Sequence, residues 1–83
     1  MRLDLFLKKT SIIKRRTIAK EIVIRGLVSI NGKVAKPSSE VKDGDILNMK
    51  LGNHLIEAKA LIEMRGTKEN PSFEIIKEEK EDK

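Results

Sequence analysis

The dipeptide Asn31-Gly32 predicts a reversal of the chain, because it lies between two short runs in which apolar and polar residues alternate as in half-buried strands. Val28 and Ile30 precede the dipeptide and Val34 follows it, with polar residues between these apolar positions. Asn-Gly is the preferred pair for a type I′ turn, in which both central residues adopt positive φ. The sequence therefore predicts a tight β-hairpin over residues 28–34.

Two helices are expected before this hairpin. In residues 2–9, Leu3, Phe6 and Leu7 follow the i, i+3, i+4 spacing of one helix face. A second helix is predicted over residues 15–25, and Gly26 stands where a left-handed residue commonly ends a helix. The inward positions of this helix are expected to be Ile18, Ala19, Ile22 and Val23.

Residues 47–76 have the pattern of strands separated by turns. Leu47, Met49 and Leu51 alternate with polar residues, and a longer alternation over residues 56–64 follows the turn pair Gly52-Asn53. Residues 66–72 are expected to form a loop, 73–76 a last short strand, and the charged residues 77–83 a frayed tail. The predicted fold class is α+β, with two N-terminal helices packed on a small, mainly antiparallel sheet in one domain over residues 1–76.

Composition argues against several classes of function. Eighty-three residues without Cys and with one His provide neither a disulfide nor a His/Cys zinc site, and no apolar run approaches the roughly 18 residues of a membrane span. Asp43 and Asp45 flank a turn glycine, where carboxylates serve turn geometry more often than catalysis. The glycines form no phosphate-binding loop. We expect a cytoplasmic monomer that is not an enzyme, holds no metal or cofactor and has no membrane partner.

Charge is segregated along the chain. Residues 1–36 contain ten Lys/Arg and two acids, a net charge of +8, whereas residues 37–83 contain eight Lys/Arg and eleven acids, a net charge of −3. A basic half of this kind indicates a polyanionic partner, above all a nucleic acid. A Lys/Glu-rich solvated surface would explain the charged content of 37% but not its segregation.

The scarcity of aromatic residues narrows the mode of nucleic-acid recognition. The chain has no Trp or Tyr, and Phe6, the one Phe within residues 1–36, is on the predicted apolar face of the first helix, so base stacking on a sheet is not expected. Recognition by backbone charge and shape favours folded RNA. A helix, a turn and a basic helix also describe a DNA-reading module, and that alternative stays open.

Taken together, these residues resemble the alpha-L RNA-binding motif, also called the S-four domain. The resemblance rests on the Arg-Leu-Asp-x-x-Leu opening, Arg16, Ala19, Gly26, Val28, Asn31-Gly32, Lys36-Pro37-Ser38 and Gly44-Asp45. It covers about residues 1–51 and leaves residues 52–76 as a β extension. The length of the chain is similar to that of the free-standing RqcP-type ribosome quality-control factors and, less closely, of a related small heat-shock protein.

The resemblance implies a function and a set of contact residues. It implies binding to ribosomal RNA and tRNA on large ribosomal subunits obstructed by peptidyl-tRNA, in support of rescue and tailing of the stalled nascent chain. The RNA contacts are expected to be Arg2, Lys9, Lys14, Arg15, Arg16, Lys20, Lys33 and Lys36. Asp4 is expected to orient Arg2 or to cap the first helix, and Arg15 replaces the Ser or Thr that caps the second helix in many relatives.

Two other functions remain open from the sequence. One is a ribosome-assembly or RNA-chaperone module that uses the same surface on a different structured RNA. The other is a protein-interaction adaptor that uses the acidic, sheet-forming half of the chain.

Overall fold

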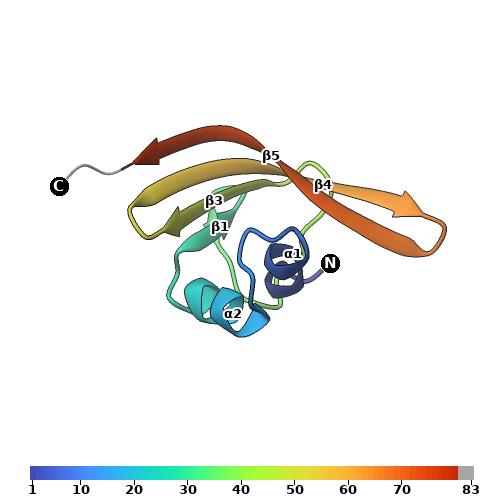
Figure 1. The fold of residues 1–83 in the computed structure, drawn as a ribbon, viewed down its shortest axis with the longest axis horizontal. Coiled ribbons are helices and arrows are strands. Elements are labelled where there is room, and N and C mark those ends of the chain that lie inside the picture. Colours follow the sequence, from blue (N-terminus) through green and yellow to red (C-terminus); the bar gives the residue numbers. More distant parts are fainter. Residues whose placement is uncertain (81–83) are drawn as a thin grey trace.

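The computed structural model describes residues 1–80, which form two helices and five strands. Helix α1 spans Leu3–Lys9 and helix α2 spans Arg16–Ile24. The strands are β1 (Val28–Ile30), β2 (Lys33–Val34), β3 (Ile46–Leu51), β4 (His54–Arg65) and β5 (Lys68–Lys80). They form one antiparallel sheet in the order β2-β1-β3-β4-β5, so the predicted α+β class is confirmed (Figure 1).

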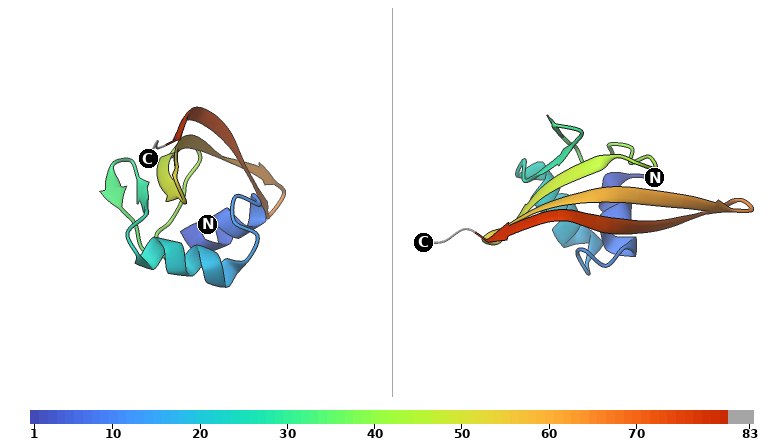
Figure 2. Two further views of the ribbon diagram at one scale, coloured as in Figure 1. Left: turned by 60° about the vertical axis from the view of Figure 1, so that its left-hand side comes forward. Right: turned by 90° about the horizontal axis from the view of Figure 1, so that it is seen from above.

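Both helices lie on the same face of the sheet (Figures 1 and 2). The core fills the space between the two layers, because alternate residues of β1, β3 and β4 point toward the helices. Its buried members are Leu3, Phe6, Leu7, Ile13, Ala19, Val23, Val28, Ala35, Val41, Leu47, Met49, Ala58 and Ala60. Within residues 1–80, the other face of the sheet carries no helix.

Helix α1 is held at both ends by hydrogen bonds from outside its own ladder. The backbone N–H groups of Leu3 and Asp4 donate to the carbonyls of Ser39 (2.8 Å) and Pro37 (3.1 Å). These bonds satisfy donors that the first turn of a helix leaves unpaired. At the other end, the Thr10 hydroxyl donates to the Phe6 carbonyl at 2.7 Å. The start of α1 is therefore fixed to the segment that follows the hairpin.

Helix α2 ends at a glycine, as predicted. Gly26 has φ +79°, and its N–H donates to the Val23 carbonyl at 2.9 Å while that of Leu27 donates to Ile22 at 3.3 Å. This pair of bonds is the Schellman arrangement. The prediction that Ile18 points inward is wrong, since its side chain is 44% exposed. The face of α2 that packs on the core is centred on Ala19 and Val23 instead.

The Asn31-Gly32 turn is confirmed. Asn31 and Gly32 have φ of 51° and 86°, the positive values that a type I′ turn requires. The Asn31 side chain also donates to the Asp45 carboxylate at 3.0 Å and accepts from the Ile46 N–H at 2.9 Å. Asp45 in turn accepts from the Lys42 N–H at 2.8 Å, and Asp43 from the Ile62 N–H at 2.8 Å. Both carboxylates thus bind backbone N–H groups, in keeping with turn chemistry.

Strand β5 differs from the expectation. Only Gly66-Thr67 separates β4 from β5, so residues 68–72 are strand where a loop was predicted, and the short strand expected over 73–76 is part of a strand of 13 residues. Residues 77–80 of the expected tail also belong to β5, whereas residues 81–83 lie outside the described part. The extra length comes from pairing with β4, interrupted by a bulge at Ile76, because Ala58 pairs with Ile75 and Glu57 with Lys77.

Candidate RNA-binding surface

Asp4 forms the centre of the candidate site. It lies in the first turn of α1 and is only 2% exposed. Its carboxylate accepts two hydrogen bonds from the Arg2 guanidinium, from Nε to Oδ1 at 3.2 Å and from Nη2 to Oδ2 at 3.3 Å. Arg16, at the start of α2, places its Nε 3.5 Å from Oδ2 of the same carboxylate. One buried acid therefore joins the two helices and two arginines.

The two arginines remain available to a partner. Their side chains are 52% and 49% exposed, whereas the Asp4 side chain is 3% exposed. A guanidinium has five N–H donors in a fixed plane, so contact with one carboxylate leaves most donors of each group free. The arrangement holds two cations at the surface in defined orientations, with a net charge of +1 including Asp4.

A serine of the following segment holds the backbone of Lys36 in a turn that is bonded to the start of α1. The Ser39 hydroxyl accepts from the Lys36 backbone N–H at 2.8 Å, and the Ser39 N–H donates to the Lys36 carbonyl at 2.9 Å. This closed turn is the one whose carbonyls cap α1, and Arg2 forms a β-bridge with Glu40 directly after it. We refer to Arg2, Asp4, Arg16 and Lys36 as the basic cluster.

The other predicted contact residues lie around the basic cluster or farther from it. Lys20 is exposed on α2, one turn after Arg16. Lys14 and Arg15 are exposed just before that helix, and Arg15 makes no side-chain capping bond, as its replacement of Ser or Thr suggested. Lys9 is in the last turn of α1, at the opposite end from Asp4, and Lys33 is exposed on β2. No hydrogen bond or ion pair of the described residues joins Lys9 or Lys33 to the basic cluster.

The sequence predicted part of this arrangement. The contact of Asp4 with Arg2 was expected, and the Asp4 carboxylate also accepts from the Leu5 N–H at 2.8 Å within the first turn. The contact with Arg16 was missed, and so was Ser39. The Ser38-Ser39 pair after Lys36-Pro37 is a signal for a side-chain-to-backbone turn and could have identified Ser39.

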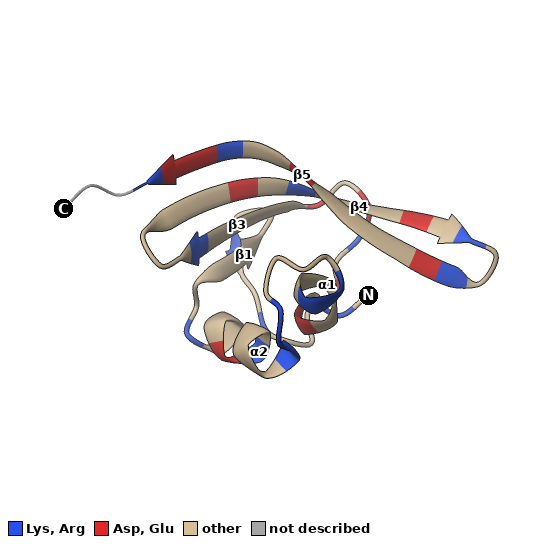
Figure 3. Ribbon diagram, in the orientation of Figure 1, with Lys and Arg blue, Asp and Glu red and all other residues tan. Residues whose placement is uncertain are grey.

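Charge is divided between the layers. Most acidic segments lie on β4 and β5, whereas α1 and α2 carry one acidic position each, Asp4 and Glu21 (Figure 3). Glu21 is paired with Arg25 at 2.8 Å. Within residues 1–80, no helix is long and apolar enough to cross a membrane, and no group of three His, Cys, Asp or Glu could hold a metal ion.

Comparison with known proteins identifies the fold family. A family model for the S4 domain matches residues 1–47, which include both helices, the hairpin and the whole basic cluster. The chain belongs to the S4 domain family. This membership confirms the resemblance to the S-four RNA-binding domain that the sequence indicated.

Relatives over the full length narrow the assignment within the S4 family. A Bacillus subtilis (strain 168) protein named RQC P-site tRNA stabilizing factor is 48% identical over 84 residues, covering 96% of both chains. A Listeria monocytogenes protein of the same name is 44% identical over 85 residues, covering 99% of this chain and 92% of the relative. The chain thus groups with the RQC P-site tRNA stabilizing factors among S4 proteins.

A solved structure supports the fold. Heat Shock Protein 15 of Vibrio cholerae, described as trimeric, superimposes with a TM-score of 0.70 at 31% identity. The match covers 74% of this chain and 62% of that one.

Proposed function

We propose that this S4 protein binds RNA of the large ribosomal subunit and stabilises P-site tRNA during the quality control of stalled ribosomes. The relatives that span nearly the whole chain carry the name RQC P-site tRNA stabilizing factor. The partners would be ribosomal RNA and the tRNA that obstructs the subunit. The protein would act as a cytoplasmic monomer that binds without catalysing a reaction.

The basic cluster is the observation that carries this proposal. Phosphate oxygens accept two parallel N–H bonds from one guanidinium, and such bidentate pairs have defined geometry as well as charge. Asp4 holds Arg2 by two hydrogen bonds and contacts Arg16 by an ion pair before RNA arrives, so less side-chain entropy is lost on binding. We assign Arg2, Arg16 and Lys36 to phosphate contacts, with Lys20 extending the surface along α2.

The remaining predicted cations would act at longer range. Lys14 and Arg15 precede Arg16 and add positive potential beside the basic cluster. Within residues 1–80, no hydrogen bond or ion pair joins Lys9 or Lys33 to that cluster, so we propose that they contribute to steering of the polyanion rather than to its orientation.

Sedimentation tests the proposal directly. The protein, with an affinity tag, should sediment in sucrose gradients with large subunits that also contain tRNA. After puromycin has released the nascent chain and the tRNA has dissociated, co-sedimentation should fall. A protein that follows free small subunits, or large subunits irrespective of tRNA, would contradict the assignment.

The same experiment separates RNA binding from the adaptor alternative. RNase treatment of the subunits should release the protein if RNA is the ligand. An adaptor that binds a ribosomal protein through the sheet would stay with its partner after RNase. Arg16→Ala should lower the occupancy of intact subunits in the first case and leave it unchanged in the second.

A further inference from the structure

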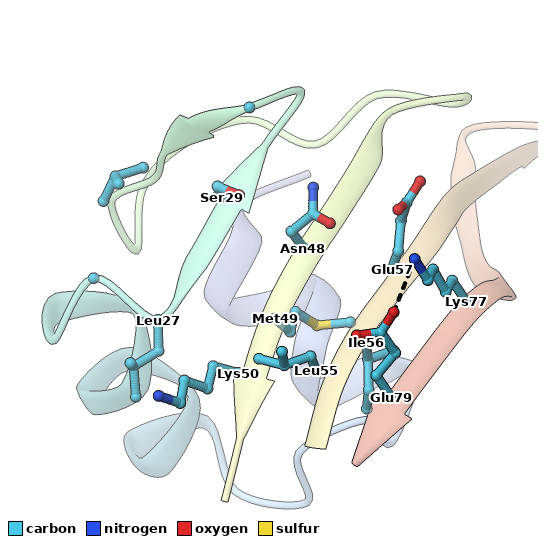
Figure 4. Close-up of a pocket in the computed structure, with 13 residues that line it drawn as sticks. Leu27, Ser29, Asn48, Met49, Lys50, Leu55, Ile56, Glu57, Lys77 and Glu79 are labelled. Carbon is cyan, nitrogen blue, oxygen red and sulfur yellow. Dashed lines mark ion pairs between the residues drawn. The ribbon is translucent and has the colours of Figure 1, made fainter. Parts of the chain in front are cut away.

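A groove of about 490 Å³ lies on the sheet face that the helices leave uncovered (Figure 4). One side is formed by the β1–β2 hairpin, including Val34, and the other by the C-terminal part of β5. Leu27 and Leu55 supply apolar surface at one end of the floor. The volume and the largely apolar lining with a few polar groups are typical of a ligand-binding groove.

A row of polar side chains crosses the floor of this groove. Ser29 pairs with Asn48, Asn48 with Glu57, and Glu57 with Lys77 on four successive strands. Their sheet neighbours Val28, Met49 and Ala58 point into the core, so the row points away from the helices. Strands are spaced by about 4.8 Å, which places adjacent members of the row within reach of one small polar group.

Glu57 differs from every other glutamate in the described residues. It alone is partly buried, and within residues 1–80 it has neither a hydrogen-bond nor an ion-pair partner. Two lysines, Lys50 and Lys77, also line the groove, and Lys77 lies 2.8 Å from Glu79. The pKa of Lys77 is raised mainly by its hydrogen bond with Glu79 and then by that residue's charge, and Glu57 contributes least. Glu57 is therefore partly buried in the groove with Lys77 as a nearby charge, but its carboxylate has no direct hydrogen bond or ion pair within residues 1–80.

We propose that this groove docks a protein segment through one arginine side chain, with the guanidinium on Glu57. An ionised carboxylate only accepts hydrogen bonds, so it requires an N–H-rich, preferably cationic group and repels phosphate. The amide oxygen of Asn48 and the hydroxyl of Ser29 offer further acceptors in the same row. The aliphatic stem of the arginine would pack on Leu55, on the same face of β4, as long cationic side chains do on apolar surface, and apolar neighbours in the segment would reach Leu27 and Val34.

This inference does not depend on the proposed RNA function. The basic cluster is built on the helix side, and the groove opens on the opposite face of the sheet. Both surfaces could therefore be occupied at once, RNA on one and a basic protein segment on the other. The chain would then connect a nucleic acid to a protein.

The test uses the full-length protein and a defined peptide, acetyl-Gly-Leu-Arg-Leu-Gly-amide. A second peptide has citrulline in place of arginine, which keeps the shape but removes the charge. Titration followed by NMR shifts should place the arginine peptide at Ser29, Asn48 and Leu55, and the citrulline peptide should bind at least about tenfold more weakly. Guanosine monophosphate is titrated as a ligand with similar N–H donors but a phosphate.

Two variants complete the design. Glu57→Gln should abolish the preference for arginine over citrulline, whereas Glu74→Gln, which removes the same charge from the neighbouring β5 strand outside the groove, should keep it. Equal affinity for the two peptides on the unmodified protein would overturn the proposal without any variant. Tighter binding of guanosine monophosphate than of the arginine peptide, or an unchanged preference in Glu57→Gln, would overturn it as well.

Discussion

Asp4 contacts two cations, Arg2 and Arg16, through one carboxylate. It is 2% exposed, while the arginines that it contacts are half exposed. Replacing Asp4 by Asn makes the surface more positive by one charge but weakens the bonds that orient Arg2 and Arg16. Charge alone would predict tighter RNA binding by this variant, and orientation predicts weaker binding.

We expect Asp4→Asn to weaken binding to tRNA-containing large subunits, despite the added positive charge. It should also lower the free energy of unfolding by about 1–2 kcal/mol, because charge-assisted hydrogen bonds become neutral ones. Equilibrium binding and urea denaturation measure the two effects. An affinity that rises with the added charge would show that orientation by Asp4 is unimportant.

Gly32 tests the hairpin at the same scale. A Cβ at this position would meet no atom within 4 Å, so the cost of a side chain comes from its φ of +86° alone. Gly32→Val should therefore destabilise the protein by more than about 1 kcal/mol, because β-branched residues oppose positive φ. Gly32→Asn should cost clearly less, since Asn tolerates this region. Equal thermal stability of both variants and the parent would contradict the turn.

The residues of the site were predictable where they act locally. Arg2 and Asp4 are two positions apart, so their contact could be anticipated from the sequence. Arg16 reaches the same carboxylate only because α1 packs against α2, and no local pattern encodes that contact. Ser39 acts through backbone carbonyls that cap α1, which depends on where the chain returns after the hairpin.

Among the elements, β5 is the least evident in the sequence and the most exposed to partners. It is the edge strand of the sheet and is 13 residues long. The Ala60 N–H donates to the Asp45 carbonyl and the Ala60 carbonyl accepts from the Gly44 N–H, both at 2.7 Å, so the backbone groups of Ala60 point away from β5. Its β5 partner Phe73 therefore directs its own N–H and carbonyl to the free edge of the sheet. Pro71, two residues earlier, faces the same edge and loses no sheet bond there.

The free edge carries several features that oppose pairing with another chain. Pro71 removes a donor, Ile76 forms a bulge, and charged residues occupy much of the strand. We predict that the double variant Pro71→Val and Glu74→Val self-associates at concentrations about tenfold lower than the parent. Sedimentation equilibrium measures this association.

Lys59→Val is the matched control for this prediction. Lys59 lies opposite Glu74 on β4, at a position where β4 pairs with both β3 and β5 and has no free edge. A valine at position 59 should leave the concentration at which the protein self-associates unchanged. Association by the control to the same extent would indicate a general effect of surface hydrophobicity instead of edge pairing.

The helices and the inner strands followed from periodicity, whereas β5 was predicted only over residues 73–76. Apolar alternation marks an element that is buried on one face, as in α1, β3 and the first half of β4. Most of β5 is exposed, so its sequence carries little alternation and reads as loop and tail. Its strand conformation comes from the register with β4, which is a tertiary effect.

On the scale of the whole molecule, the two layers differ in charge. Binding through the basic layer should depend steeply on salt, because each phosphate contact releases condensed counterions. If about five cations meet phosphates, the slope of log K against log salt should be roughly −3.5 to −4.5. Titrations at several salt concentrations measure it. A slope near zero would exclude phosphate contacts as the main source of affinity.

The contributions of guanidinium geometry and of net charge to RNA binding can be separated most directly at this scale. Arg16→Lys keeps the charge of the molecule and removes the planar donor set that Asp4 orients. We predict that occupancy of tRNA-containing large subunits then falls, with an affinity lower by about fivefold, whereas Lys80→Ala at the end of β5 has almost no effect although it removes a charge. Equal occupancy for the parent, Arg16→Lys and Lys80→Ala would contradict the account, because it would make Arg16 one interchangeable surface cation among many.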